Sequence, residues 1–331
     1  MKKLILGVDG GGSKSHLAMF DENGECACVS ACGALNHESL EGSFGELETV
    51  LAGFLRDALK QAGACAGDVA YAVFGMAGAD TAAQHETISG ILRRAGLRHF
   101  SLYNDAFLGV AAGCPDGVGV CAINGTGTSM AAVDHSGGAL QIAGLGDLTD
   151  DRGGGGWYGR QVLGAVYNSL YKGGKATSMR DMLFARLGVA RKEAYLETLT
   201  AAFANGEIGY GAAGRYVFAA AEAGDGVAVG ILKQSARHFA GGIAYMASEM
   251  DFPADRTLYV TYAGSVFVKE KVRALPRLIE ERVRARLGDR PVEFRMLDTV
   301  PVAGAVLWAS QKAGFGVGMA AIKRSLADAG I

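Results

Sequence analysis

The chain has 331 residues, of which half are hydrophobic and a fifth are charged, and its formal net charge is −2. This composition is typical of a folded protein with about two domains and excludes a disordered chain. The near-neutral charge favours neither nucleic acid nor an anionic membrane as a partner. No apolar stretch is long enough for a signal peptide or a membrane span, so we expect a cytoplasmic protein.

A glycine-rich turn follows the first expected strand. The segment reads Val8-Asp9-Gly10-Gly11-Gly12-Ser13-Lys14-Ser15, and a second apolar run begins at His16. Two strands around a short glycine turn predict a β-hairpin, in which glycines let backbone N–H groups converge on phosphate oxygens. Asp9 could hold a metal ion bound to those oxygens. An ordinary hairpin turn is the alternative, but Asp9 before the glycines and the Ser-Lys pair after them favour phosphate binding.

The first third of the chain predicts the element order β-β-β-α-β-α-β, which is typical of a mixed α/β layer architecture. The expected strands are Lys3–Asp9, His16–Asp21, Glu25–Ala31, Val69–Gly75 and Phe100–Asn104, and the expected helices are Leu40–Ala62 and Ala82–Ala95. Asp105 follows the last of these strands, at a sheet edge where open α/β sheets bind ligands. The alternative for Asn104 and Asp105 is a helix cap.

A similar order then begins again. We expect strands at Gly117–Ile123, Ser129–Val133 and Ala139–Ala143, helices over much of Trp157–Met250, strands at Leu258–Thr261 and Val292–Met296, a helix between these two strands, and two final helices. The first two strands flank a second glycine turn, Gly125-Thr126-Gly127-Thr128, for which a plain hairpin turn is again the alternative. The repeated pattern indicates an internal duplication with a nucleotide between two facing turns.

The cysteines show no metal-ligand spacing. Six occur, and the close set is Cys26, Cys28 and Cys32, with no Cys-x-x-Cys pair and no histidine partner. We expect reduced, structural thiols.

Several of these segments together resemble the actin, heat-shock chaperone and sugar kinase superfamily. The matching segments are the first glycine turn, Asn36-His37, Asn104-Asp105-Ala106, Ile123–Thr128 and Ala263-Gly264-Ser265-Val266. Within the superfamily they are similar to the N-acetylglucosamine kinase branch, whose relatives include the BadF-type ATPases. The resemblance implies an α/β fold of two duplicated ribonuclease H-like (actin-like ATPase) domains, at 1–116 and 117–331, with a nucleotide cleft between them. The resemblance further implies that the second domain carries a helical insertion and that its last helix packs back on the first domain.

The resemblance also implies an ATP-dependent kinase that phosphorylates the 6-hydroxyl of an amino sugar, with N-acetylglucosamine first. Asp105 would be the catalytic base, Asp9 would orient Mg²⁺, and a homodimer is expected. ATP would be bound by Gly10, Gly11, Gly12, Ser13, Lys14, Gly125, Thr126, Gly127, Thr128, Gly264 and Ser265, and the sugar by Asn36, His37, Asp105, Asp151 and Arg152.

One segment departs from the family pattern. Relatives read Gly-Asp-Glu-Gly-Ser before an aromatic residue, whereas this chain reads Asp150-Asp151-Arg152-Gly153-Gly154 and reaches Trp157 after two more glycines. Glu38 also stands where an aromatic residue is common. Arg152 could pair with the carboxylate of an acidic sugar such as N-acetylmuramic acid, or with a neighbouring aspartate.

Three alternatives to an N-acetylglucosamine kinase stay open. One is a kinase for glucosamine or N-acetylmuramic acid. Another is a BadF-type ATPase that activates a radical dehydratase, which needs a cysteine placed to ligate an iron–sulfur cluster; Cys114 and Cys121 are its candidates. The third is a sugar-responsive repressor, which would carry a helix-turn-helix domain for which we find no sign.

Overall fold

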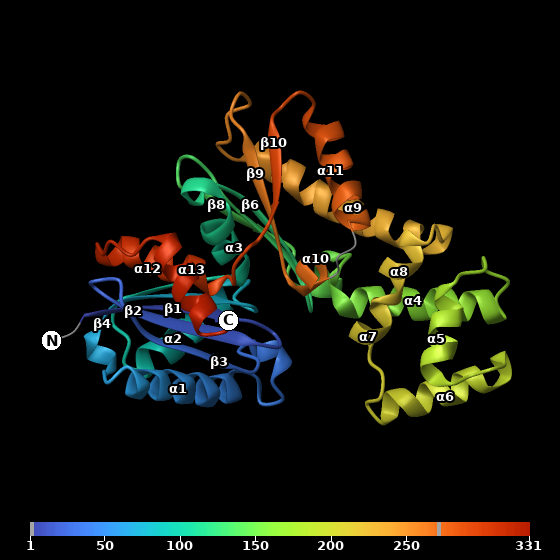
Figure 1. Cartoon of the computed structure of the whole chain (residues 1–331), viewed down its shortest axis with the longest axis horizontal. Coiled ribbons are helices and arrows are strands. Elements are labelled where there is room, and N and C mark those ends of the chain that lie inside the picture. Colours follow the sequence, from blue (N-terminus) through green and yellow to red (C-terminus); the bar gives the residue numbers. More distant parts are fainter. Residues whose placement is uncertain (1–2, 270–272) are drawn as a thin grey trace.

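The computed structural model describes residues 3–269 and 273–331 and contains two five-stranded sheets (Figure 1). The first sheet has the order β3-β2-β1-β4-β5. Its strands are β1 (Leu4–Gly10), β2 (Ser15–Asp21), β3 (Cys26–Cys32), β4 (Val69–Met76) and β5 (Phe100–Tyr103), and helices α1 (Ser43–Gln61), α2 (Ala82–Arg94) and α3 (Asp105–Gly113) follow β3, β4 and β5.

The second sheet repeats this plan with the order β10-β9-β6-β7-β8. Its strands are β6 (Gly119–Asn124), β7 (Thr128–Val133), β8 (Ala139–Ile142), β9 (Leu258–Ala263) and β10 (Val292–Met296). In both sheets the first three strands are antiparallel neighbours and the last two run parallel to the first. The internal duplication predicted from the sequence is therefore confirmed, and the two hairpin turns occupy equivalent places.

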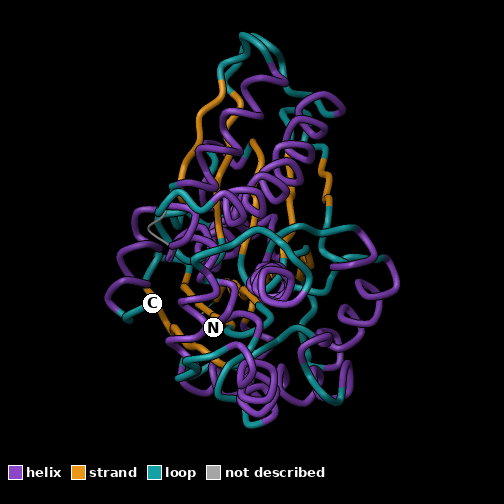
Figure 2. The backbone as a smooth tube through the Cα atoms, turned by 90° about the vertical axis from the view of Figure 1, so that its right-hand side faces the viewer, coloured by secondary structure: helices purple, strands orange, loops and turns teal. Residues whose placement is uncertain are grey.

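Helices α4 to α9 lie between β8 and β9 in the chain. They are α4 (Gly154–Tyr171), α5 (Met179–Leu187), α6 (Lys192–Ala204), α7 (Tyr210–Gly214), α8 (Tyr216–Glu222) and α9 (Gly226–Glu249). Figure 1 shows α4 to α8 at the right of the molecule, whereas α9 runs back to the second sheet beside α11 (Ala274–Leu287). Figure 2 shows the strands of the second sheet in the upper half of the molecule with helices on their sides.

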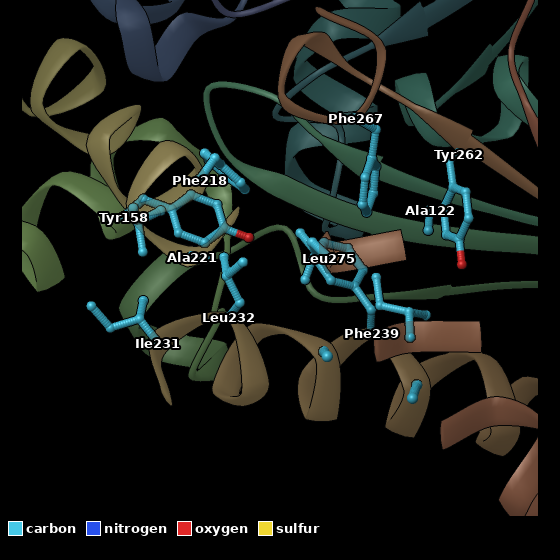
Figure 3. Close-up of a cluster of buried hydrophobic side chains, with 14 of the residues drawn as sticks. Ala122, Tyr158, Phe218, Ala221, Ile231, Leu232, Phe239, Tyr262, Phe267 and Leu275 are labelled. Carbon is cyan, nitrogen blue, oxygen red and sulfur yellow. The ribbon is translucent and has the colours of Figure 1, made fainter. Parts of the chain in front are cut away.

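Aromatic side chains join this helical region to the second sheet (Figure 3). Tyr158, Phe218 and Phe239 belong to one continuous buried cluster with residues of β9 and α11. The Tyr158 hydroxyl lies 2.6 Å from Ser235 Oγ and accepts a hydrogen bond from Asn124 Nδ2 at 3.1 Å. Because Asn124 is the last residue of β6, the core of the helical region directly supports the second glycine turn.

The last two helices, α12 (Val302–Ala313) and α13 (Met319–Asp328), pack on the first sheet although they end the chain. Val306 of α12 and Ile322 of α13 are fully buried in one cluster with Ile5 and Phe20. A Cβ atom at Gly7 would lie 2.7 Å from the Val306 backbone nitrogen, so glycine permits the close approach of α12 to β1. The domain limits 1–116 and 117–331 stay a prediction.

None of the helices in the described part of the chain combines the length and the apolar character that crossing a bilayer requires.

Candidate active site

A cavity of about 950 Å³ lies between the two sheets at the ends of β1 and β6. It brings together residues that lie far apart in the sequence. Of the residues predicted to bind ligands, Asp9, Gly11, Gly12, Ser13, Lys14, Asn36, Asp105, Gly125, Thr126, Gly127, Thr128, Asp151, Gly264 and Ser265 line it. Gly10, His37 and Arg152 are not among the lining residues.

The two glycine turns face each other across this cavity. Ser13 Oγ and Thr126 Oγ1 are 3.0 Å apart, although 113 positions separate them in the chain. In the first turn a Cβ atom at Gly11 would lie 2.6 Å from the Lys14 carbonyl oxygen, so the tight turn needs glycine there. In the second turn the buried Thr128 hydroxyl has no hydrogen-bond partner among the described residues. Both turns therefore offer donors to an anionic ligand.

Gly10 has a packing role in the structure. A Cβ atom there would lie 2.5 Å from Met76 Sδ, so glycine makes room for the Met76 side chain beneath the turn.

Asp9 lies at the end of β1, where it is almost fully buried, and burial raises the pKa of its carboxyl. His16 is its partner across the hairpin, with Nδ1 at 3.8 Å from Asp9 Oδ2. The sequence analysis assigned His16 no partner. The hairpin pairing is the signal that could have found it, because it sets residue 16 opposite residue 9.

Asp105 is the first residue of α3, and one residue, Asn104, separates it from the end of β5. Asn104 caps this helix by accepting a hydrogen bond from the Ala106 backbone N–H at 2.9 Å, so the cap role falls to Asn104 and not to Asp105. Burial, and then the negative charges of Asp9 and Asp80, raise the pKa of Asp105 to about 7. A carboxylate with this pKa at a cavity wall suits a general base.

The residues predicted to bind the sugar differ in their positions. Asn36 lines the cavity and caps a short 3-10 helix (His37–Ser39) through Oδ1, which accepts from the Glu38 backbone N–H at 3.0 Å. His37 is buried beneath it, with its ring stacked on Phe44 at 3.9 Å between centroids. His37 thus packs against α1 and supports Asn36 from behind.

Asp151 lines the cavity but uses its carboxylate on its own loop. Oδ2 accepts from the backbone N–H groups of Gly144 and Gly146 at 3.0 and 2.9 Å, and Oδ1 accepts from Thr149 Oγ1 at 2.9 Å. His238 of α9 lies 4.0 Å from Oδ1. Asp151 therefore fixes the loop that closes this end of the cavity.

Arg152 is half-exposed and pairs with Asp150. Its Nη2 donates to Asp150 Oδ2 at 2.9 Å and its Nε to the same carboxylate at 3.1 Å. Of the two readings of this arginine, the structure contains the local ion pair, and Arg152 is not among the residues that line the cavity.

For the amino sugars that the sequence resemblance implies as substrates, Arg152→Ala should therefore raise the KM for N-acetylmuramic acid and for N-acetylglucosamine by the same factor, below about threefold, since exposed ion pairs contribute little. Steady-state kinetics with both sugars will measure the two factors. A KM for the acidic sugar that rises at least tenfold more would restore Arg152 as its ligand.

Gly264 and Ser265 form the far wall of the cavity, between β9 and α10 (Ser265–Lys269). Gly264 has φ = +90°, and a Cβ atom there would lie 2.5 Å from the Asn124 carbonyl oxygen. Opposite, Gly154 begins α4 and donates its backbone N–H to Asn124 Oδ1 at 2.8 Å. The glycine run 153–156 thus lies at the start of a helix beside the cavity.

Three comparisons with known proteins agree with this geometry. The family model of the BadF/BadG/BcrA/BcrD ATPases matches residues 6–309. The chain belongs to this family. The chain is also 25% identical over 280 residues to an N-acetylmuramic acid/N-acetylglucosamine kinase of Clostridium acetobutylicum, which covers 80% of this chain and 86% of that protein.

Solved structures show the same fold. A protein from Chromobacterium violaceum, provisionally assigned as an N-acetylglucosamine kinase, superposes with a TM-score of 0.69 at 20% identity and covers 93% of this chain and 99% of its own. A protein from Porphyromonas gingivalis with the same provisional assignment gives a TM-score of 0.61 at 17% identity and covers 94% and 99%. The duplicated two-domain fold expected from the sequence is therefore confirmed.

Proposed function

We propose that this member of the family is an ATP-dependent kinase that phosphorylates the 6-hydroxyl of an amino sugar, with N-acetylglucosamine as the first candidate. The observation that carries the proposal is the position of Asp105. A carboxylate with a pKa of about 7 lines the same cavity as two facing glycine turns. The similarity to the Clostridium acetobutylicum kinase supports an amino sugar as the acceptor.

The nucleotide would lie between the two turns. The Gly11 backbone N–H donates to Ser15 Oγ at 3.2 Å within the turn. Backbone N–H groups of Gly12 and Gly127, with the hydroxyls of Ser13 and Thr128, would hold the phosphates, and Lys14 would offset their charge. Gly264 and Ser265 would lie against the adenosine. Such preorganised donors stabilise the charge that develops during phosphoryl transfer.

Asp9 fits the Mg²⁺ that ATP-dependent phosphoryl transfer uses. Its buried carboxylate has a raised pKa, and a cation beside it would offset the cost of burial. The described residues contain no group of three metal-ligating side chains. A single carboxylate suits Mg²⁺, which keeps several waters and binds through one or two carboxylates and the substrate phosphates. When bound, Mg²⁺ would neutralise charge on the phosphates.

In the transfer step, the 6-hydroxyl oxygen forms a bond to the γ-phosphorus while the bond to the bridging oxygen of ADP breaks. Asp105 takes the hydroxyl proton. Asn36 would accept or donate a hydrogen bond to the sugar ring.

Two cysteines bear on the alternative of a dehydratase activator. Cys121 is fully buried, and Cys114 is 6% exposed with its sulfur 3.3 Å from Thr261 Oγ1. Burial raises the pKa of Cys114 to about 11 and that of Cys121 well above its ordinary value. A cluster ligand must be a thiolate that reaches the cluster, so this geometry favours a structural role for both.

A coupled ADP-release screen will test the function. The sugars are N-acetylglucosamine, glucosamine, N-acetylmuramic acid, N-acetylmannosamine and glucose, with no sugar as the control for ATP hydrolysis. We expect sugar-dependent ADP release with N-acetylglucosamine. ADP release that no sugar stimulates, together with visible absorption of anaerobically purified protein, would instead support the dehydratase activator. Size-exclusion chromatography with light scattering will test the expected homodimer.

The kcat/KM for the sugar at saturating ATP should fall as the pH is lowered through a pKa at or below about 7, because only deprotonated Asp105 accepts the proton. Bound Mg²⁺ and ATP shift this value, so the direction is the diagnostic part. The pH profile between 5 and 9 will measure it. A rate that stays flat across this range would contradict general-base catalysis by Asp105.

A further inference from the structure

Asp80 is a carboxylate in the cavity that the sequence analysis did not single out. It lies between β4 and α2 and lines the cavity. Its Oδ1 accepts hydrogen bonds from Asn104 Nδ2 at 3.0 Å and from Gln141 Nε2 at 2.5 Å. Asn104 precedes Asp105, and Gln141 belongs to β8 of the second sheet. Two amide groups from different parts of the fold therefore fix one oxygen of Asp80.

The other oxygen, Oδ2, accepts no hydrogen bond from any residue in the described ranges 3–269 and 273–331. A glycine makes room for this arrangement. A Cβ atom at Gly144 would lie 2.7 Å from Asp80 Oδ1, and Gly144 has φ = +116°. The loop that Asp151 fixes therefore packs directly on Asp80 and holds its orientation.

Asp80 and Asp151 differ in what they have left to offer a ligand. Three loop donors already bond to the Asp151 carboxylate. Asp80 keeps one whole oxygen for an incoming donor. Of the two carboxylates, Asp80 is the better acceptor for a sugar hydroxyl.

The electrostatic setting of Asp80 also favours a role as a hydrogen-bond acceptor for the sugar. Burial, and then the charges of Glu38 and Asp151, raise the pKa of Asp80 to about 6, while the Gln141 and Asn104 amides lower it. Further hydrogen bonds to the carboxylate would favour its charged form. The hydroxyls of a neutral sugar are such donors.

We propose that Asp80 is a sugar-binding residue whose Oδ2 accepts a hydrogen bond from the 3- or 4-hydroxyl of the acceptor sugar. The hydrogen bond between Asp80 and Asn104, the neighbour of the proposed base, sets this contact beside the 6-hydroxyl. Asp151 organises the loop that covers it. The inference rests on the proposed function and names a specificity-determining residue for it.

Asp80→Asn distinguishes binding of the sugar by Asp80 from the support that Asp80 gives to Asn104 and Gln141. The asparagine carbonyl oxygen can still accept from Asn104 and Gln141, whereas an amide NH₂ replaces the free oxygen. Isothermal titration calorimetry will give Kd for N-acetylglucosamine and its 3-deoxy and 4-deoxy analogues. In the wild type we expect one analogue to bind about 10- to 100-fold more weakly, as for a lost hydrogen bond to a charged group. In Asp80→Asn, the Kd for the parent sugar should rise by a similar factor, whereas the Kd for that analogue should not rise further.

Two further variants complete the design. Asp147→Asn removes a carboxylate from the rim of the same cavity, where its side chain is 90% exposed, so the analogue should still bind more weakly than the parent sugar in that variant. Gln141→Leu removes one support and keeps Asp80. Discrimination against the analogue should persist there, because Asn104 still holds Asp80, and the wild-type comparison of the analogues carries the test if Asp80→Asn does not fold.

An equal loss of affinity for the parent and both analogues in Asp80→Asn, or a wild type that binds both analogues as tightly as the parent sugar, would show that Asp80 only joins the two halves. If the wild type phosphorylates amino sugars but the weaker binding of the deoxy analogue does not depend on Asp80, only the role of Asp80 is overturned. A wild type that phosphorylates none of the screened sugars overturns the proposed function and the inference with it.

Discussion

Asp105→Asn is expected to lower kcat for the amino sugar by about 10²- to 10⁴-fold, the usual effect of removing a general base. Asparagine has the same shape but accepts no proton at neutral pH. The Asn104 cap of α3 does not involve the Asp105 side chain, so the helix should form normally. The Kd for ATP, measured by calorimetry, should change by less than about threefold. Turnover near the wild-type value would remove Asp105 from the role of base.

The same variant should be more stable than the wild type at pH 8. A carboxyl whose pKa is about 7 in the folded state and 3.8 when unfolded binds protons preferentially in the folded state. Its destabilising effect therefore grows as the pH rises from about 4 to 7 and is complete above 7. Asp105→Asn should raise the free energy of unfolding at pH 8 by on the order of 2 kcal/mol, and by less at pH 5.

Urea unfolding at both pH values will measure this difference, with Asp57→Asn on the exposed face of α1 as the control. A loss of turnover together with a gain of stability would indicate that the site places Asp105 in an environment that lowers the stability of the fold but suits catalysis. A variant that is less stable than the wild type at both pH values would instead indicate a structural role.

Local patterns explain what the sequence could predict. The glycine turns are short hairpins whose residues are contiguous, so spacing alone indicates them. Asp105 closely follows a strand, and the edge of an open sheet is a general place for ligands. The duplication is visible because each half repeats the same order of elements.

Contacts between distant segments explain what could not be predicted. Asp80 acquires its place only when Gln141 of β8 and Asn104 meet it, and no pattern around residue 80 signals this. Asp151 lines the cavity as expected, but its carboxylate bonds to its own loop because that loop folds back through Gly144 and Gly146. Arg152 could not be assigned from its position alone, because Asp150 and the cavity were both within reach of a long side chain.

Gly264→Ala should have the second-largest effect, a loss of ATP affinity of at least about tenfold with a lower free energy of unfolding. Residues other than glycine are strained at φ = +90°, which costs on the order of 1–3 kcal/mol. The new methyl group would also lie 2.5 Å from the Asn124 carbonyl oxygen. Asn124 must then shift, and it holds both Gly154 and Tyr158, so the second glycine turn and the start of α4 should move with it.

Calorimetry with a non-hydrolysable ATP analogue and urea unfolding will measure both effects. The control is Gly164→Ala within α4, where a Cβ atom meets no neighbour within 4 Å. Its free energy of unfolding should rise by up to about 1 kcal/mol, because alanine favours a helix.

Sugar affinity without nucleotide should fall much less in Gly264→Ala, since Asn36 and Asp80 belong to the first half. Wild-type affinity for the ATP analogue would mean that the nucleotide does not lie against Gly264. The atoms nearest to the new methyl group belong to Asn124 of β6 and not to β4. Equal losses of nucleotide and sugar affinity would therefore mean that the strain spreads from this wall through the whole cavity.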